Sequence, residues 1–254
     1  MPRTRFLLTL AALAGVPAAG AAQAGAPDLA RRLPADGAVR LSFAARDGVC
    51  GNGGNNITIV SDDERDEWQS DCRPGPVRVS LHLKRGRVQQ AHTYVGGRWR
   101  PATDSVTDLG TVPAAAAAAE LVVLAGKAER DGDALITAAS LADSARIWPA
   151  LFGLARRPEV PVDTRKQAVF WIGQAAGAEA AKGLDSVVTD ESGDLEVRKQ
   201  AVFALSQRPA DEGVPALIKV ARTNRSGELR KTALFWLGQS EDPRALALFE
   251  EILQ

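Results

Sequence analysis

The sequence predicts an α+β chain of two parts, in which a small β-rich domain is followed by an all-α superhelical solenoid. The first observation is a phrase of ten residues that occurs three times, beginning at Arg165, Arg198 and Arg230, with spacings of 33 and 32 residues. Repetition at this period is typical of solenoids, because each unit buries its apolar face only against its neighbours. The second observation is the alternation of apolar and polar residues over 77–83, which is typical of a half-buried strand.

A change of composition at Asp104 gives the boundary between the two parts. Beyond this residue the sequence becomes rich in Ala, Leu and Val with helical spacing. We therefore expect a signal peptide at 1–24, the β-rich domain at 25–104 and the solenoid at 105–254.

The first 24 residues have the pattern of a secretory signal peptide. Basic Arg3 and Arg5 precede a short apolar run, and small residues with the spacing A-x-A predict cleavage near Ala24. The run is shorter than the roughly 20 apolar residues that span a bilayer, so no integral membrane span is expected after cleavage. The expected location is the bacterial periplasm or the extracellular medium. An uncleaved N-terminal anchor is the alternative.

Cys50 and Cys72 are expected to form a disulfide that staples the β-rich domain. An even pair of cysteines in an exported protein is more often a bridge than a metal or catalytic site. Closing this loop would stabilise the fold by about 3 kcal/mol in the loop-entropy model. The acidic run 62–67 inside the loop is expected to be a solvated, charged segment.

Four strands are expected in the β-rich domain, at 39–43, 57–60, 77–83 and 88–95. The last two form a hairpin around the turn at 84–87. If Leu83 faces Val88, the two histidines of the sequence, His82 and His92, lie on opposite faces and cannot share a metal ion unless the register shifts by one residue. We therefore expect a solvated His82, a half-buried His92 and no metal site.

The solenoid is expected to open with an alanine-rich helix that has Pro113 in its first turn. Proline suits that position, and alanine has the highest helix propensity. Helical hairpins with short loops follow. The expected pairs are 133–142 with 145–157, 163–174 with 178–189, 195–207 with 212–223, and 228–239 with 243–253.

The paired helices resemble HEAT repeats, especially the short bacterial repeats also found in phycobilin-lyase relatives. The resemblance rests on the Val197-Arg198 and Leu229-Arg230 steps that open first helices and on the phrase Val-Pro-Ala-Leu at 214–217 that opens a second helix. It covers about residues 110–254. It implies a right-handed, curved α-solenoid that binds another protein along one face. No lyase cysteine is carried over, because both cysteines lie outside the repeats.

The arginine that opens each copy of the phrase falls at the edge of the face predicted to form the core. Charged groups beside a core need partners. We therefore expect Arg165, Arg198 and Arg230 to neutralise loop carboxylates such as Asp163, Asp190 and Asp194, and so to brace adjacent units.

The opposite face of each repeated helix carries an aromatic residue. Phe170, Phe203 and Phe235 hold equivalent positions and lie beside Lys166, Lys199 and Lys231. In a stack this column either packs against neighbouring units or faces solvent. Exposed aromatic residues rimmed by polar groups mark binding sites. These six residues are therefore the candidate partner-binding residues.

Charge and motifs narrow the function. The 31 basic and 31 acidic residues balance, whereas nucleic-acid binders concentrate a basic excess, so no nucleic-acid partner is expected. The histidines adjoin no G-x-S-x-G elbow, and we expect no catalytic residue and no cofactor. The prediction is an exported protein-interaction or scaffold protein that binds another protein. The alternatives are a lyase-type or other ligand-modifying enzyme with its site at the seam between the two parts, and a purely structural envelope protein.

Overall fold

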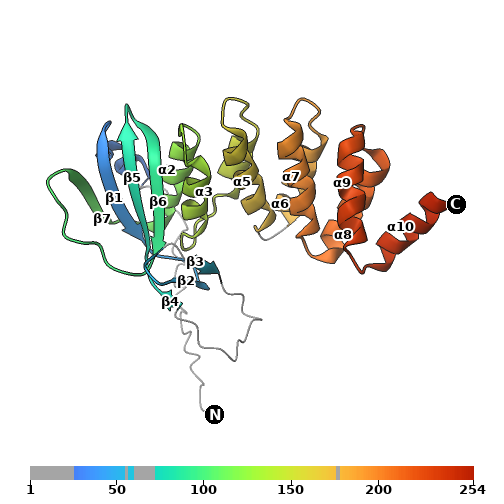
Figure 1. Cartoon of the computed structure of the whole chain (residues 1–254), viewed down its shortest axis with the longest axis horizontal. Coiled ribbons are helices and arrows are strands. Elements are labelled where there is room, and N and C mark those ends of the chain that lie inside the picture. The colour runs from blue at the N-terminus through green and yellow to red at the C-terminus, as the bar shows by residue number, and fades with distance from the viewer. Residues whose placement is uncertain (1–25, 55–56, 60–71, 176–177) are drawn as a thin grey trace, which may run out of the picture.

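A computed structural model describes residues 26–54, 57–59, 72–175 and 178–254. A β-sheet stands at one end, and helices stacked side by side lead away from it toward the C-terminus (Figure 1). The buried apolar side chains of both parts form one continuous core. The predicted α+β chain, with a β-rich N-terminal part and a helical remainder, is confirmed. The expected signal peptide at 1–24 lies outside the described residues.

The larger sheet has four strands in the order β6-β5-β1-β7. The strands are β1 (Gly37–Phe43), β5 (Val77–Lys84), β6 (Arg87–Val95) and β7 (Val106–Thr111). β1 and β5 are antiparallel, as are β5 and β6, whereas β7 runs parallel to β1. Alternate residues of β5 are buried, from Val77 to Leu83. On the helical side, β6 contacts α2 (Ala114–Ala125) and α3 (Gly132–Ser140).

β7 lies past the boundary expected at residue 104, so the β part of the chain is longer than the sequence suggested. Because β6 and β7 occupy opposite edges of the sheet, the connection 96–105 crosses from one edge to the other. Trp99 lies on this crossing. Its ring centroid is 6.0 Å from that of Tyr94 and 5.4 Å from the guanidinium carbon of Arg40. The connection therefore packs on the outer face of the sheet.

The β5–β6 hairpin has another register than the one expected. Leu83 does face Val88, but a β-bulge at Gln89 shifts the following pairs by one residue. His82 and His92 consequently share the outer face of the sheet, and both are exposed. The predictions that they lie on opposite faces and that His92 is half-buried were wrong.

The bulge is held by a contact from outside the hairpin. The side-chain amide of Gln89 donates to the Glu129 carboxylate at 3.1 Å, and the Glu129 main-chain amide donates to the Val88 carbonyl at 3.2 Å. A bulge re-aims side chains along a strand and is commonly found at sheet edges. Here it depends on a residue that lies 40 positions further along the chain.

Other segments cover the rest of the outer edge of β6. The Ala91 amide donates to the Asp131 carboxylate at 2.9 Å, and the Val95 carbonyl accepts from the Gly53 amide at the same distance. Unpaired edge strands promote pairing between molecules. The loop between α2 and α3 therefore completes the sheet while it leads into the solenoid.

A second, three-stranded sheet has the order β3-β2-β4. Its strands are β2 (Val49–Gly51), β3 (Ile57–Ile59) and β4 (Arg73–Pro74). The predicted disulfide between Cys50 and Cys72 is confirmed, with Cα atoms 5.2 Å apart. The acidic run 62–67 lies outside the described residues. A Cβ on Gly53 would lie 2.9 Å from the Gly97 Cα, so the two sheets meet at a contact that requires glycine.

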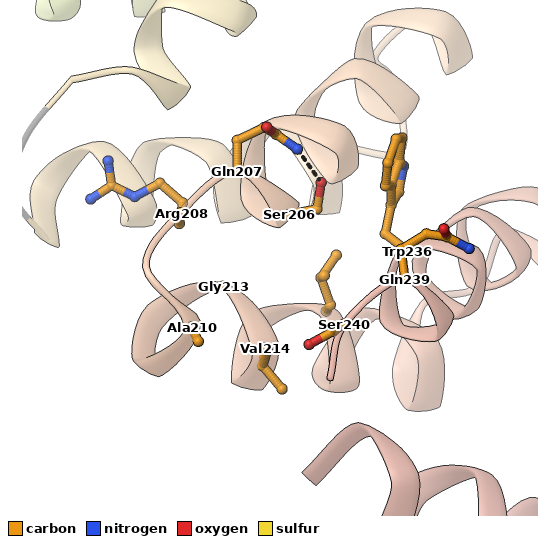
Figure 2. A pocket seen from close by; sticks show the side chains of 10 residues that line it. Ser206, Gln207, Arg208, Ala210, Gly213, Val214, Trp236, Gln239 and Ser240 are labelled. Atoms are coloured by element: carbon orange, nitrogen blue, oxygen red, sulfur yellow. Dashed lines mark hydrogen bonds between the residues drawn. The ribbon is translucent and has the colours of Figure 1, made fainter. Parts of the chain in front are cut away.

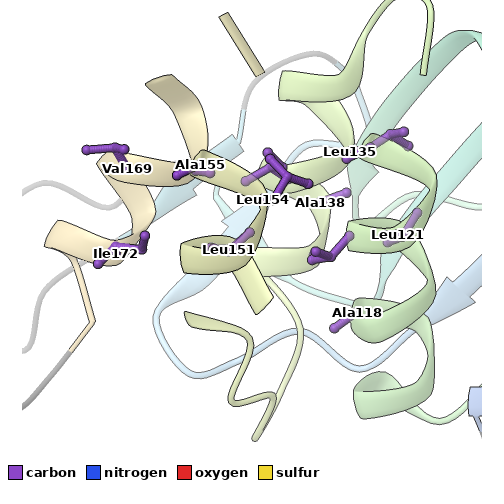
Figure 3. Close-up of a cluster of buried hydrophobic side chains, with 14 of the residues drawn as sticks. Ala118, Leu121, Leu135, Ala138, Leu151, Leu154, Ala155, Val169 and Ile172 are labelled. Carbon is purple, nitrogen blue, oxygen red and sulfur yellow. The ribbon is translucent and has the colours of Figure 1, made fainter. Parts of the chain in front are cut away.

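The helical part matches the predicted pairs closely. After α1 (Ala26–Arg32) and the alanine-rich α2, the pairs are α3 with α4 (Trp148–Ala155), α5 (Val162–Gly173) with α6 (Ala178–Thr189), α7 (Leu195–Ser206) with α8 (Ala210–Thr223), and α9 (Gly227–Gly238) with α10 (Pro243–Leu253). Figure 3 shows the core passing from Leu121 of α2 through Leu135 and Leu151 to Ile172 of α5. Successive units therefore bury their apolar faces against one another.

Candidate functional site

The solenoid has two kinds of surface, one from the first helices of the pairs (α3, α5, α7, α9) and one from the second helices (α4, α6, α8, α10). Polar contacts link successive second helices. They join Arg156 to Ser186 at 2.8 Å, Lys219 to Asp185 at 2.9 Å, and Arg222 to Glu251. The surface of the second helices is therefore occupied by contacts that tie the units together.

The three repeated arginines brace the units through main-chain carbonyls. Arg165 donates to the Val160 carbonyl at 2.9 Å, and Arg198 donates twice to the Val188 carbonyl, at 3.1 and 3.0 Å. Val188 lies in the last turn of α6, where helix carbonyls lack partners and carry partial negative charge, whereas Val160 lies in the loop between α4 and α5.

Arg230 follows the same arrangement, with donations to the Asn224 carbonyl at 2.7 Å and the Arg225 carbonyl at 3.0 Å. A carboxylate partner of the expected kind is found for Arg165, which lies 3.5 Å from Asp194. The carbonyl contacts are shorter, so main-chain oxygens are the principal partners of these arginines.

Arg208 is a further bracing residue that the sequence reasoning did not single out. Its side chain is only 4 % exposed, and it forms an ion pair with Glu212 at 2.6 Å. It also donates to the carbonyls of Gly173 at 3.2 Å and Ala175, at the end of α5. Other copies of the repeat have Ala175 and Ser240 at this position. The sequence did contain a signal for this role, because Arg208 stands where the related units carry small residues.

A cavity of about 240 Å³ adjoins Arg208, between the ends of α7 and α9 and the start of α8. Figure 2 shows Ser206 and Gln207 on one side of it and Trp236, Gln239 and Ser240 on the other. Its polar side chains are amides and hydroxyls, the indole of Trp236 and the guanidinium of Arg208. The cavity is therefore a small packing space between units and holds no cluster of acids or bases.

The predicted aromatic column lies on the surface of the first helices. Phe170 and Phe203 are partly buried, whereas Phe235 is 59 % exposed. The Phe203 ring centroid is 5.0 Å from that of Trp236 in the next unit, and Phe235 contacts the same indole at 5.0 Å. Packing therefore accounts for part of the column. We call Phe170, Phe203, Phe235 and Trp236 the aromatic stripe.

The lysines beside the stripe are paired within their own helices. Each contacts the acidic residue three positions earlier: Lys166 with Asp163 at 3.8 Å, Lys199 with Glu196 at 3.2 Å, and Lys231 with Glu228 at 3.4 Å. Exposed pairs of this kind add little stability. Their effect is that each unit presents the same neutral set of an acid, a lysine and an aromatic ring.

A groove of about 480 Å³ runs along this surface at the start of the stripe. It is lined by Asp133 of α3, by Asp163, Lys166, Gln167 and Phe170 of α5, and by Gln200 of α7. The surface therefore includes a concave region, as ligand sites commonly do. Two of its lining residues, Asp133 and Gln200, belong to the units on either side of the one that carries Phe170.

The seam between the sheet and the solenoid is closed by the main chain. The Arg46 amide donates to the Leu141 carbonyl at 2.8 Å, and Ala45 forms a β-bridge with Ala142. A cavity of about 800 Å³ lies beside this contact, and the ionisable residues among those that line it are Arg46 and Asp47. The ionisable lining of this cavity therefore consists of one cation and one carboxylate.

Neither a metal cluster nor a membrane helix is found in the part of the chain that the structure describes. His82 and His92 share a face, yet no three His, Cys, Asp or Glu side chains gather there or elsewhere among these residues. Within the same ranges, no helix has the length and apolar character needed to cross a bilayer.

The last helix offers a test by pH. Hydrogen bonds from the Arg244 side chain and main chain lower the pKa of Asp242, the N-cap of α10, from 3.8 to about 2. A lowered pKa in the folded state stabilises the fold above the unfolded value, and this contribution disappears as the pH falls from about 4 to about 2. We expect amide exchange in α10 to accelerate over that range. Asp242→Asn should remove the acceleration while keeping the cap, and Glu250→Gln, an exposed acid of the same helix, should not.

Residues 188–254, which contain α7–α10, match the family model of HEAT repeats. The HEAT resemblance is thereby confirmed, while the narrower likeness to phycobilin-lyase relatives is not. No curated protein matches the chain.

Proposed function

Residues 188–254 match HEAT repeats, and on that premise we propose that the protein is a scaffold that binds another protein along the surface of its first helices. Repeat solenoids commonly use extended surfaces of this kind for binding. The single observation that carries the choice of surface is the contrast between the two sets of helices. Polar contacts join each second helix to the next. Among the first helices, Gln167 joins α5 to α3 through Thr137, and the surface beyond displays a repeated aromatic residue, of which Phe235 is 59 % exposed.

The stripe has the composition of an interaction site. Aromatic side chains supply most of the binding energy at interfaces, and they are typically surrounded by polar groups that exclude water. Here the rings lie between lysine–acid pairs and glutamines such as Gln200. Because the lysines are neutralised by neighbouring acids, the surface suits a polypeptide better than a polyanion.

We further propose that the protein is exported to the periplasm and has no enzymatic activity. The disulfide between Cys50 and Cys72 is compatible with an oxidising compartment, and the pattern of residues 1–24 is that of a signal peptide. The cavity beside the seam supports a non-enzymatic role, since Arg46 and Asp47 are its ionisable lining residues. The ligand-modifying alternative would need more than one such pair at this place.

The proposed surface is tested by affinity capture with matched variants. Phe235→Ser removes a ring that is 59 % exposed, and Leu246→Ser removes an apolar side chain of α10 that is 60 % exposed. The amount of partner protein captured from native cells should be lower by about tenfold or more with Phe235→Ser than with the wild type, which is the loss typical of a central aromatic residue. Leu246→Ser should capture the same amount of partner as the wild type. Equal capture by both variants would exclude the stripe as the binding surface.

A further inference from the structure

On the basis of the proposed function, we infer that the partner segment bound by the aromatic stripe is an extended polyproline II peptide with a basic residue at the end that lies over α3 and α5. The inference rests on the continuity of the stripe, its spacing, the chemistry of its side chains and the charge of its first groove.

The stripe is continuous across the first helices. Gln167 of α5 donates to the Thr137 hydroxyl of α3 at 2.9 Å, and Phe170 and Gln200 line one groove between α5 and α7. Phe203 of α7 meets Trp236 of α9 with ring centroids 5.0 Å apart. A bound segment can therefore run across α5, α7 and α9 and meet an aromatic ring in each of them.

The spacing of the units selects the conformation of that segment. Packed helices lie about 8–10 Å apart, so equivalent side chains recur at about that distance. A polyproline II helix repeats every three residues at a rise of 3.1 Å, which is about 9 Å per turn. A β-strand returns to the same side after about 6.7 Å. One polyproline turn per unit fits this surface, and a strand does not.

An α-helical partner fits the width of the stripe poorly. It would meet the spacing only with every second turn, and its diameter of about 10–12 Å requires a broad apolar groove. The helices α5, α7 and α9 instead offer a single phenylalanine each, flanked in α7 by Lys199 and Gln200, and Lys199 contacts Glu196. The apolar path is one ring wide at this unit.

The side chains of the stripe suit proline. Polyproline II segments dock against aromatic rings, and their low conformational entropy reduces the cost of binding. The Phe203 and Trp236 rings are inclined at 51°, and the Phe235 and Trp236 rings at 78°. The three rings pack on one another, and the exposed Phe235 ring offers a surface against which a pyrrolidine ring can pack. The carbonyls of such a peptide have no internal partners, and the Gln200 side chain in the groove can donate to them.

The first groove adds a charge requirement. Asp163 is paired with Lys166, whereas Asp133 has no cationic partner among the described residues. The groove next to Phe170 therefore has an excess of one negative charge. A lysine or arginine of the peptide would complement Asp133, and this contact would set the direction in which the peptide lies.

The test uses synthetic peptides and the full chain. A fluorescent peptide of about twelve residues, made of Pro-Pro-Ala repeats with arginine at one end, is titrated by anisotropy against one with glycine in place of proline and one with alanine in place of arginine. We expect the proline peptide to bind at least about tenfold more tightly than the glycine peptide. Phe203→Ala should abolish that preference, and Asp133→Asn should remove the advantage of arginine over alanine. Leu246→Ser should change neither.

Folding and binding are separated in this design. Phe203→Ala is accompanied by Phe235→Ser, because the Phe235 ring is largely exposed and its removal should leave the circular dichroism and the melting temperature unchanged. Equal affinity for the proline and glycine peptides would overturn the inference. If capture of a native partner still depends on Phe235, the proposed function survives that result; if capture is also independent of Phe235, both fail.

Discussion

Replacing Arg208 with methionine is expected to lower the free energy of unfolding by about 3 kcal/mol. The Arg208 side chain is 4 % exposed, pairs with Glu212, and donates to the Gly173 and Ala175 carbonyls of the preceding unit. Methionine retains much of the volume but leaves those carbonyls without a buried donor. Because repeat proteins are held together by contacts between neighbours, the loss should fall on the junction between α5–α6 and α7–α8.

Denaturation followed by circular dichroism and tryptophan fluorescence measures this effect. Arg225→Met is the matched control, since the Arg225 side chain is 83 % exposed and pairs with Glu191 across the same two units. Exposed ion pairs contribute less than about 1 kcal/mol. The Arg208 variant should also unfold in two steps, with α7–α10 melting first. A loss equal to that of Arg225→Met would show that the buried contacts carry no special stability.

Loss of the Cys50–Cys72 bridge is expected to cost the β part about 3 kcal/mol. The two cysteines are 22 positions apart, and the closed loop reduces the entropy of the unfolded chain. The bridge also holds β2, whose residues are buried, next to β4. The Cys50→Ala/Cys72→Ala double variant should therefore melt at a lower temperature than the wild type.

A reductant provides the internal control for this experiment. Dithiothreitol should lower the melting temperature of the wild type toward that of the double variant and should leave the double variant unchanged. The free energy is taken from the change in the β-part transition, because a solenoid joined to a sheet need not unfold in a single step. A wild type that melts at the same temperature with and without reductant would refute the assignment of stability to the bridge.

The helical part was predictable because the same sequence pattern occurs in several of its units. The phrase at Arg165 recurs at Arg198 and Arg230, so each copy fixes the phase of the others and the predicted helices end within a few residues of the observed ones. The same comparison separated core positions such as Ala168 from the stripe. It left open whether the phenylalanines pack or face solvent, because contacts such as that of Phe203 with Trp236 depend on how adjacent units pack.

The β part was less predictable because its contacts are distant in sequence. β7 contains Asp108 and Gly110, and Leu109 is its one buried residue, so it lacks the alternation that marks a strand. Its pairing comes from β1, about 70 residues earlier. The bulge at Gln89 similarly depends on Glu129. The local sequences of β7 and of the bulge therefore do not indicate the distant segments with which they pair.

The arginines illustrate a third limit. Their position beside the core followed from helical geometry, but their partners did not, because main-chain carbonyls are present at every residue and leave no mark in a sequence. Val188, which accepts from Arg198, is an ordinary core valine by its side chain. The sequence could therefore suggest carboxylate partners, but it could not identify the main-chain carbonyls that lie closer.

The loop that covers the edge of β6 determines how this chain can be divided. A fragment ending at Thr111 would keep all four strands of the larger sheet but would lose Glu129 and Asp131, the partners of the Val88 carbonyl and the Ala91 amide. Its open edge would recruit a second copy. Helical pairs can therefore be added or removed at the C-terminal end of the solenoid, whereas the sheet and the first helical pair form one unit that can be exchanged only as a whole.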